Sequence, residues 1–309
     1  MIYRNKCDVI KLINEKQIKK NDLVFSSMKF CEFNEDKCDG LYVHHDKKIS
    51  MIFGIKNNAI LAPFSAPFGF IRYASDYVKY SHVLNFFKSL KESVDNHDSI
   101  NEIKIVLPPY FYNESMVTKI SLALSELRFT LKYRDINSHI DLDKFSLDAL
   151  PSSTKKAIRL SNSYSNDFRI AEKMEDKILA YNVIKENREM KGYPLRMSLE
   201  QVIATTKDIV KAHFFIATVE GEPAAAAIVF EISDTTAQVV YWGANEVGEK
   251  CNVMYFLPME IIKYFKGLEK KNLDIGPSSE FGIISNGLND YKQMIGCENS
   301  NKETWVYSK

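Results

Sequence analysis

The chain lacks an excess of charge of either sign. Its 309 residues include 41 Lys and Arg against 40 Asp and Glu, which gives a formal net charge of +1. Proteins that hold nucleic acid mainly by neutralising phosphates usually have a basic excess. The near balance therefore argues against a DNA-binding protein, although it does not exclude a local basic patch.

Cysteine and histidine are also scarce, which argues against a disulfide framework and against a metal site. The five cysteines are scattered along the chain and form no Cys-x-x-Cys pair. The adjacent residues His44 and His45 would point to opposite faces of a strand, so they cannot chelate one metal ion. We therefore expect no disulfide framework, no metal site and a reducing, cytoplasmic location.

Long apolar runs are missing as well. The longest, at residues 224–230, is far shorter than the ~20 residues that span a bilayer. Residues 1–21 are charged throughout, unlike a signal peptide. Motifs of serine hydrolases, P-loop proteins, dinucleotide-binding proteins and zinc peptidases are absent too. The sequence thus predicts a cytoplasmic protein without a membrane span.

What the sequence does contain is an order of elements that occurs twice. Each copy reads as paired strands, a helix, a strand that ends at Pro or Gly, and a second helix. The first copy spans 41–64, 75–94, 102–109 and 113–127, and the second spans 214–245, 252–266, 272–277 and 286–294. Such self-similarity predicts duplicated modules.

Local signals support the helices of this scheme. Apolar residues between 78 and 94 recur at three- and four-residue spacing, as on one face of a helix. Ser75 and Asp76 suit the N-terminus of that helix. Val9, Ile10 and Ile13 likewise suit one face of an earlier short helix.

A Ser-rich segment at 146–166 reads as a connector, and we place the domain boundary there. Two helices, at 176–190 and 198–210, then open the second module. We predict an α/β (α+β) fold of two tandem modules, each a mixed, mostly antiparallel sheet flanked by helices. Residues 1–145 would form a non-catalytic module that shapes the acceptor cleft, and residues 146–309 the catalytic module.

The end of the second module carries the sharpest motif. A strand ending Asp274-Ile275-Gly276-Pro277 precedes a short helix with the run Tyr291-Lys292-Gln293-Met294-Ile295-Gly296. This resembles the C-terminal signature of the Fem-type (FemABX) peptidyltransferases of the GNAT superfamily, in which the helix reads Phe-Lys-x-x-Phe-Gly. Segments 147–170 and 180–202 resemble the inter-domain helix and the paired helices of these proteins. The resemblance covers 150–309 well and 1–149 in pattern.

The resemblance implies two tandem GNAT-like modules and transfer of an acyl group to an amine. The motif lysine, here Lys292, is implied to stabilise the tetrahedral oxyanion, a role in which one donor contributes about 3–4 kcal/mol. The alternative interpretation is that Lys292 is a solvated lysine on the protein surface. Tyr291 would line the acceptor site or protonate the leaving group, or else pack in the core. Glu186 would deprotonate the amine if burial raised its pKa.

The resemblance further implies a donor site where strand 236–245 separates from strand 272–277. Acyl-CoA, most simply acetyl-CoA, would bind there without a metal, its pyrophosphate on the amides that open the next helix. The expected donor-binding residues are Trp242, Gly243, Asn245, Gly248, Lys250 and Asn252. The usual Gln/Arg-x-x-Gly-x-Gly/Ala turn is absent, and Glu246 and Glu249 oppose a phosphate.

The acceptor should enter near the turn between the helices of the second module. Arg188 would clamp a phosphate or carboxylate bidentately, with Tyr193 beside it. Asp274 and Ser278 complete the expected substrate-binding set. The alternative for Arg188 and Tyr193 is an exposed helix pair with an ordinary turn.

We therefore predict an N-acyltransferase that moves an acyl group from acyl-CoA to an amine. The acceptor would be a small-molecule or lipid-linked amine, such as the amino sugar or peptide of a cell-envelope precursor. One alternative is a Fem-type transferase that uses aminoacyl-tRNA, which the near-neutral charge disfavours. Another is an inactive GNAT-like binding module, which the degenerate phosphate turn favours. The sequence does not distinguish a monomer from a dimer.

Overall fold

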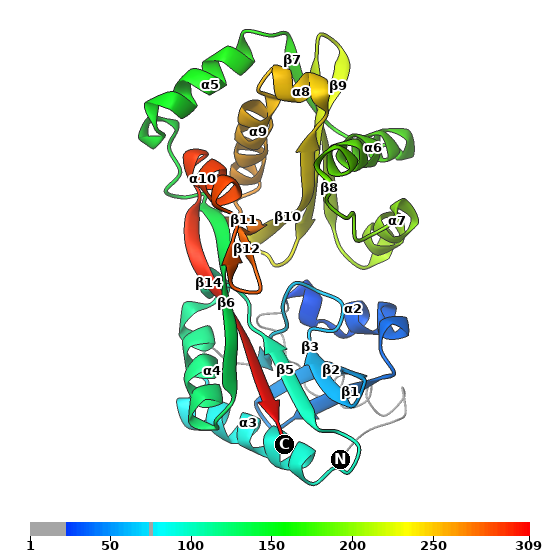
Figure 1. The fold of residues 1–309 in the computed structure, drawn as a ribbon, viewed down its shortest axis with the longest axis vertical. Helices are drawn as coiled ribbons and strands as arrows, with labels where there is room; N and C mark the ends of the chain where they lie inside the picture. The colour runs from blue at the N-terminus through cyan, green and yellow to red at the C-terminus, as the bar shows by residue number, and fades with distance from the viewer. Residues whose placement is uncertain (1–22, 74–76) are drawn as a thin grey trace. The chain divides into compact units, whose positions relative to one another are not determined.

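The computed structural model describes residues 23–73 and 77–309 (Figure 1). Contacts divide the chain into two compact units. Unit 1 contains the described residues up to 136, together with 279–283 and 300–309, and unit 2 contains 137–278 and 284–299. The predicted helix at Val9, Ile10 and Ile13, and the predicted helix start at Ser75 and Asp76, lie outside the described residues.

Unit 1 is built around the predicted strand pair and helices of the first copy. Strands β1 (Gly40–His45), β2 (Ile49–Lys56) and β3 (Ala59–Ala62) pair antiparallel, and β5 (Glu102–Val106) lies parallel to β3. Helix α3 (Tyr80–Asp95) precedes β5, and α4 (Glu114–Glu126) follows it. The short elements of this unit are η1 (Val24–Ser26), α2 (Met28–Phe33), η2 (Glu35–Lys37), β4 (Arg72–Tyr73), η3 (Tyr110–Tyr112) and β12 (Ser279–Glu280).

Unit 2 repeats this order after four additional elements. These are α5 (Ser152–Asn162), β7 (Asn166–Ile170), α6 (Met174–Lys191) and α7 (Leu199–Asp208). The repeat itself comprises β8 (Ala212–Val219), β9 (Glu222–Glu231), β10 (Thr236–Ala244), α9 (Val253–Gly267), β11 (Asn272–Pro277) and α10 (Asn286–Met294). Strands β7 to β10 pair antiparallel, and β11 lies parallel to β10. Short elements are η4 (Leu147–Ala149) and α8 (Glu246–Lys250), and β13 (Ile283–Ile284) begins at the last residue of unit 1.

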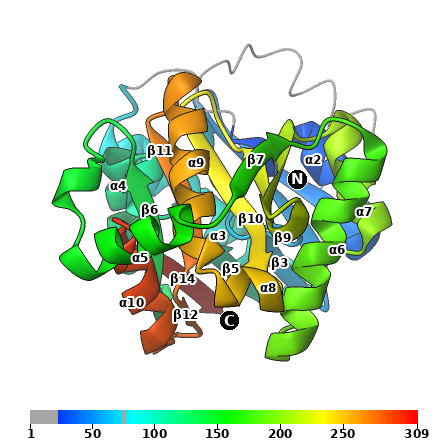
Figure 2. The same cartoon turned by 90° about the horizontal axis from the view of Figure 1, so that it is seen from above.

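The helices of unit 2 cover both faces of its strands. Figures 1 and 2 show α9 on one side and α6 and α7 on the other. Because both faces are covered, the central strand β9 is apolar throughout its middle, and Ala224 to Phe230 are all buried. The longest apolar run of the sequence is therefore the centre of a sheet.

The last strand of each repeat pairs with a strand of the other repeat. Strand β6 (Thr130–Asp141) follows α4 in the chain, yet its second half pairs antiparallel with β11. Strand β14 (Glu298–Ser308) follows α10, yet it pairs antiparallel with β5. The division by contacts accordingly falls before the predicted boundary at 145/146 and returns residues 300–309 to unit 1. Strand pairing, which chain order does not reveal, decides this assignment.

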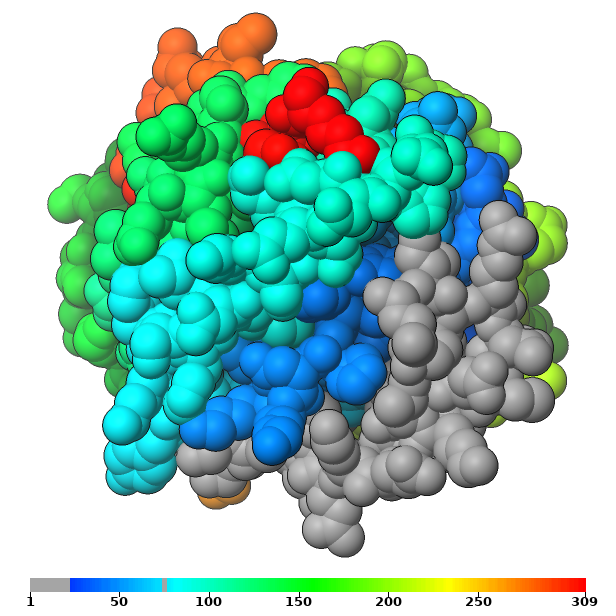
Figure 3. All heavy atoms as spheres, turned by 90° about the horizontal axis from the view of Figure 1, so that it is seen from below, coloured from blue at the N-terminus to red at the C-terminus, as the bar shows by residue number. Residues whose placement is uncertain are grey.

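The end of the chain is held within unit 1. The Lys309 backbone N–H donates to Asn101 O, and its Nζ donates to His97 O. Figure 3 shows these last residues in red beside the cyan residues of unit 1. Among the described residues, no helix combines the length and hydropathy that a bilayer-spanning segment needs.

His44 on β1 is a partly buried histidine held in its neutral form. Its ring packs edge-on against Phe86. Its Nδ1 lies 3.1 Å from Tyr42 Oη, and its Nε2 lies 2.8 Å from Ser89 Oγ. Burial lowers the pKa of His44 to about 4, because a charged imidazolium loses its hydration there.

We predict that this histidine makes unit 1 sensitive to acid. The unfolded chain, with an ordinary histidine pKa of about 6.5, takes up the proton before the folded chain does. His44 therefore does not lower the free energy of unfolding above about pH 6.5. Below that pH the free energy of unfolding decreases, and it continues to decrease as the pH falls toward 4. In His44→Gln, which keeps polar partners but does not titrate, the melting temperature should fall less steeply between pH 6.5 and 4.5. The control is His45→Gln on the same strand, and identical slopes for His44→Gln and the unsubstituted protein would refute the assignment.

Candidate functional site

A set of buried polar side chains gathers in unit 2 where β6, β10, β11 and α10 meet. Every member is more than nine-tenths buried: Asn137, Ser138, His139, Gln238, Asp274, Ser278, Asn289 and Lys292. Burying polar groups costs free energy unless each is hydrogen-bonded, so such clusters are kept where they specify geometry or chemistry. We take this polar cluster as the candidate site.

Lys292 is the cation of the polar cluster. It projects from α10 toward the end of β11, next to which α10 lies in Figure 1. Its side chain is only 3% exposed. The Nζ group donates hydrogen bonds to Gly276 O and Pro277 O, each at 2.8 Å. The alternative of a solvated surface lysine is therefore excluded.

Asp274 and Ser278, predicted to bind substrate, have protein partners instead. Asp274 is fully buried, and its carboxylate accepts hydrogen bonds from Asn137 Nδ2, Gln238 Nε2 and the Gly276 backbone N–H. Ser278 Oγ lies 2.9 Å from Ser138 Oγ. Both residues thus shape the polar cluster from within.

Strands β10 and β11 separate beside the polar cluster. They pair only between Thr236–Gln238 and Asn272–Asp274. Beyond that point β10 is irregular against β9 between Val239 and Tyr241, and β11 is irregular against β6 between Asp274 and Gly276. This separation of two parallel strands is the feature expected at the donor site.

Tyr291 fills the region next to this separation. Its ring makes edge contacts with Trp242 of β10 and Tyr255 of α9, at centroid distances of 6.3 and 5.9 Å. Its hydroxyl donates to Met254 O at 2.6 Å, and burial raises its pKa well above the ordinary value. A phenol that holds its proton so firmly and shares it with a carbonyl is a poor acid, so the packing alternative describes Tyr291 better, and Trp242 packs against it.

Asn245, Gly248 and Lys250, in the segment expected to hold a pyrophosphate, make hydrogen bonds or ion pairs with other residues of the protein. Asn245 caps α8, accepting from the Gly248 N–H at 3.0 Å and donating to Pro223 O at 2.9 Å. A Cβ on Gly248 would overlap Ala224 O, so this glycine allows close packing of α8 on β9. Lys250 is exposed and pairs with Glu246 at 2.6 Å.

Asn252, the last of the predicted donor-binding residues, has left-handed backbone with φ of +56° just before α9. The Asn252 side chain does not cap the amides that open α9. Of the residues predicted to bind the coenzyme A pyrophosphate, Gly248 and Lys250 have partners within the protein.

Arg188 on α6 is the second cation of interest. Among the described residues, its Nε is buried and has no hydrogen-bond partner. The guanidinium lies 6.0 Å from the ring centroid of Tyr241, and burial lowers its pKa. A partly buried guanidinium whose Nε has no partner among the described residues is suited to an anionic ligand.

The other predicted residues of this helix and turn are open to solvent. Glu186 is exposed, so the burial on which its role as a base depended is absent. Tyr193 is 57% exposed. The turn itself is confirmed, with Gly192 in left-handed conformation at the C-terminus of α6.

Several residues of the site were not predicted from the sequence. Asn137, Ser138 and Gln238 lie on strands, and Asn289 lies on α10. The one available signal was the polar run Asn137-Ser138-His139 inside an otherwise regular strand. Asn187 was missed too: its Nδ2 donates to Ala244 O at 2.6 Å and so ties α6 to β10.

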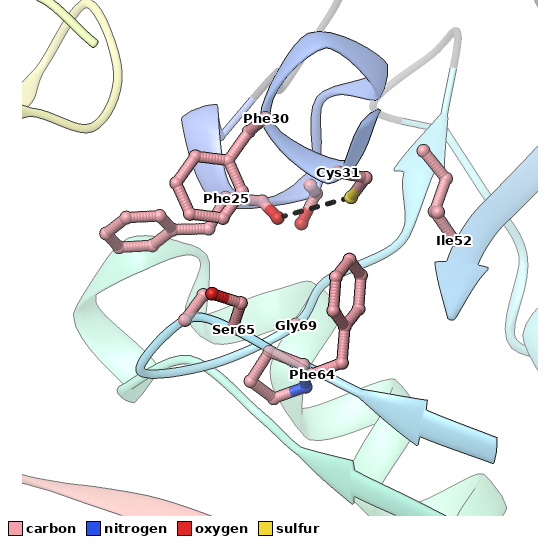
Figure 4. A pocket seen from close by; sticks show the side chains of 10 residues that line it. Phe25, Phe30, Cys31, Ile52, Phe64, Ser65 and Gly69 are labelled. Atoms are coloured by element: carbon pink, nitrogen blue, oxygen red, sulfur yellow. Dashed lines mark hydrogen bonds between the residues drawn. The ribbon is translucent and has the colours of Figure 1, made fainter. Parts of the chain in front are cut away.

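Unit 1 holds a small apolar cavity that does not resemble a catalytic site. Figure 4 shows it lined by Phe25, Phe30, Cys31, Ile52 and Phe64, with room for about one water molecule. Burial raises the pKa of Cys31 to about 12, so this thiol is not a nucleophile. Within 23–73 and 77–309, no three His, Cys, Asp or Glu side chains are placed to hold a metal ion.

We predict that Gly243 is required for the packing of α6 on β10. A Cβ at this position would overlap the Asn187 side chain, so Gly243→Ala should lower the free energy of unfolding by about 1–3 kcal/mol. Gly267→Ala is the control, because Gly267 ends α9 with open space around it. That change should leave stability equal or raise it by up to about 1 kcal/mol. Urea unfolding measures both, and equal stability of Gly243→Ala and the unsubstituted chain would contradict the packing argument.

Comparison with known proteins connects this geometry to a fold. No protein-family model matches the chain, and the search of curated proteins finds no match. The structure is similar to the crystal structure of FemX, with a TM-score of 0.69 and 12% identity over 94% of each chain. It is also similar to a Bacteroides thetaiotaomicron protein of unknown function (0.66, 12%, all of each chain) and to L-PGS from Bacillus licheniformis (0.61, 13%, 94% of each chain). These likenesses confirm the predicted Fem-type fold of tandem GNAT-like modules.

Proposed function

We propose that this chain is an acyltransferase that joins an acyl or aminoacyl group to an amine, with Lys292 stabilising the oxyanion. The observation that carries the proposal is the buried Lys292 ammonium at the end of β11, beside the point where β10 and β11 separate. Burying an ammonium group is costly, and a surface residue would avoid that cost. A Fem-type fold that keeps a cation in this position supports a catalytic use for it.

The reaction would follow the ordinary course of acyl transfer. The amine nitrogen attacks the ester or thioester carbonyl carbon, a C–N bond forms, and the carbonyl electron pair moves to the oxygen. The Lys292 ammonium stabilises that oxyanion, and Gly276 O and Pro277 O hold the ammonium in place. The adduct then collapses, the bond to the leaving group breaks, and the proton lost by the amine passes to the leaving oxygen or sulfur. A cation fixed in advance needs no reorganisation during these steps.

For the donor, we favour an aminoacyl ester over acyl-CoA. Coenzyme A would place its pyrophosphate on residues 245–252, where the Gly248 N–H is bonded to Asn245 and Lys250 is paired with Glu246. An aminoacyl ester of tRNA, the alternative donor, would not place a coenzyme A pyrophosphate on that segment. The engaged state of α8 thus supports the donor that net charge alone disfavoured.

For the acceptor, Arg188 supports an amine that also carries an anionic group. Its buried Nε lacks a partner among the described residues, and a phosphate or carboxylate would supply one. An amino sugar or peptide on a nucleotide or lipid carrier has both the amine and the phosphate. We therefore propose a cell-envelope precursor of this kind as the acceptor.

Replacing Lys292 tests the central claim. Lys292→Ala should lower turnover by about a hundredfold or more, as the loss of an oxyanion donor does. Lys292→Met, which keeps an apolar stem in the buried site, should lower turnover equally, with a smaller loss of melting temperature. The control is Lys263→Ala on α9, an exposed lysine paired with Glu260. Turnover of Lys292→Met within a factor of two of the unsubstituted chain would remove Lys292 from the mechanism.

Thermal shift measurements distinguish the donors. A non-hydrolysable aminoacyl-tRNA at a hundred times its Kd should stabilise the folded chain by about 2.7 kcal/mol, whereas acetyl-CoA should not change the melting temperature. Uncharged tRNA serves as the control for non-specific binding. Stabilisation by acetyl-CoA alone would favour the acyl-CoA donor instead, and no shift with either donor would favour an inactive binding module.

A further inference from the structure

We infer that Asp274 is the positioning residue that holds the Lys292 ammonium in place through the end of β11, an inference that rests on the role proposed for Lys292. Asp274 would not touch the substrate, because three donors of the protein already occupy its carboxylate. Both of its carboxylate oxygens accept hydrogen bonds from the protein. The residue predicted to bind substrate would thus act on the reaction only through the lysine.

The connection between the two charged groups runs through Gly276. Asp274 Oδ1 accepts a hydrogen bond from the Gly276 N–H at 2.8 Å. The carbonyl of the same residue accepts from Lys292 Nζ, also at 2.8 Å, and the carbonyl of Pro277 does the same. A carboxylate that fixes the direction of the Gly276 N–H therefore fixes the two carbonyls that hold the ammonium.

Strand pairing with β6 is interrupted just before Gly276 and resumes there in a shifted register. The register between β11 and β6 shifts between Asp274 and Gly276, and Gly276 has a φ of +80°. Such a bulge leaves one residue outside the ladder of strand hydrogen bonds, and a positive φ at this value favours glycine. The Asp274 side chain supplies the acceptor that the interrupted ladder does not.

Asp274 is itself held from both neighbouring strands. Asn137 Nδ2 of β6 donates to Oδ1 at 2.7 Å, and Gln238 Nε2 of β10 donates to Oδ2 at 2.7 Å. Gln238 stands opposite Asp274 at the last paired position before β10 and β11 separate. The carboxylate therefore joins three strands at the point from which the lysine-binding carbonyls extend.

The Lys292 ammonium can be observed directly, without a substrate, by ¹H–¹⁵N NMR of the full chain labelled in lysine. Its signal is assigned by its loss in Lys292→Arg. A buried ammonium with fixed carbonyl partners exchanges its protons slowly, so this signal should be resolved. In Asp274→Ala the carbonyls lose their fixed direction, and proton exchange should become at least tenfold faster. Asp274→Asn should restore slow exchange, because its Oδ1 still accepts from Gly276 and the Gln238 amide can turn to accept from the new NH₂.

A second variant covers the case in which Asp274→Ala does not fold, since it leaves two buried side-chain amides and the Gly276 N–H without their acceptor. Gly276→Ala meets open space but disfavours the positive φ, so it should also speed the proton exchange of Lys292. Its matched control is Gly221→Ala, in the turn between β8 and β9. Gly221 has a φ of +88° and equally open surroundings, and it makes no contact with the polar cluster.

Two results would overturn the inference. One is an unchanged Lys292 signal in both Asp274→Ala and Gly276→Ala despite lower melting temperatures, which would make Asp274 merely structural. The other is equal loss in Asp274→Ala and Asp274→Asn, because the acceptor geometry would then not be what matters. In turnover assays, Asp274→Ala should lower kcat by about tenfold or more with little change in KM. Failure of the proposed reaction would appear only in those assays, so it stays distinguishable from failure of the positioning role.

Discussion

The structure around the candidate site depends on a buried ammonium group. Hydrogen bonds to backbone carbonyls offset the free energy that its desolvation costs. Lys292 is the buried cation at the end of β11, and the carbonyls of Gly276 and Pro277 accept its hydrogen bonds. Those carbonyls keep their direction only while the bulge in β11 keeps its shape. The polar side chains of β6 and β10 reach the same bulge through Asp274. The bulge thus links this cation to the buried side chains of Asp274, Asn137 and Gln238.

The two candidate cations of unit 2 come from elements on opposite faces of its strands. Lys292 lies at the end of β11 on the α10 side, whereas Arg188 comes from α6, which covers the opposite face of the strands. Trp242 and Gly243 illustrate the division on β10: Trp242 contacts Tyr291, and Gly243 faces Asn187 of α6. A substrate that engaged both cations would have to pass the edge where β10 and β11 separate.

Much of the fold could be predicted from local sequence, but the site only in outline. Helical spacing between 78 and 94 correctly predicted α3, and the motif around Lys292 correctly predicted a short helix after β11. The partners of Asp274 could not be predicted, because Asn137 and Gln238 are far from it in sequence and come close to it only through strand pairing. Gly248 shows the opposite error: a glycine expected to admit a phosphate instead admits a neighbouring strand. Composition alone does not distinguish these two reasons for a glycine.

The exchange of final strands has a consequence for biosynthesis. Strand β5 of unit 1 pairs on one side with β3 and on the other with β14, whose paired residues lie at 304–308. While the ribosome is still translating the second repeat, that edge of β5 has no native partner, and an open edge can pair with another chain. Most of unit 1 is synthesised first, yet β5 gains its second neighbouring strand only when the last segment has emerged. Nascent chains therefore carry an incomplete sheet for most of translation.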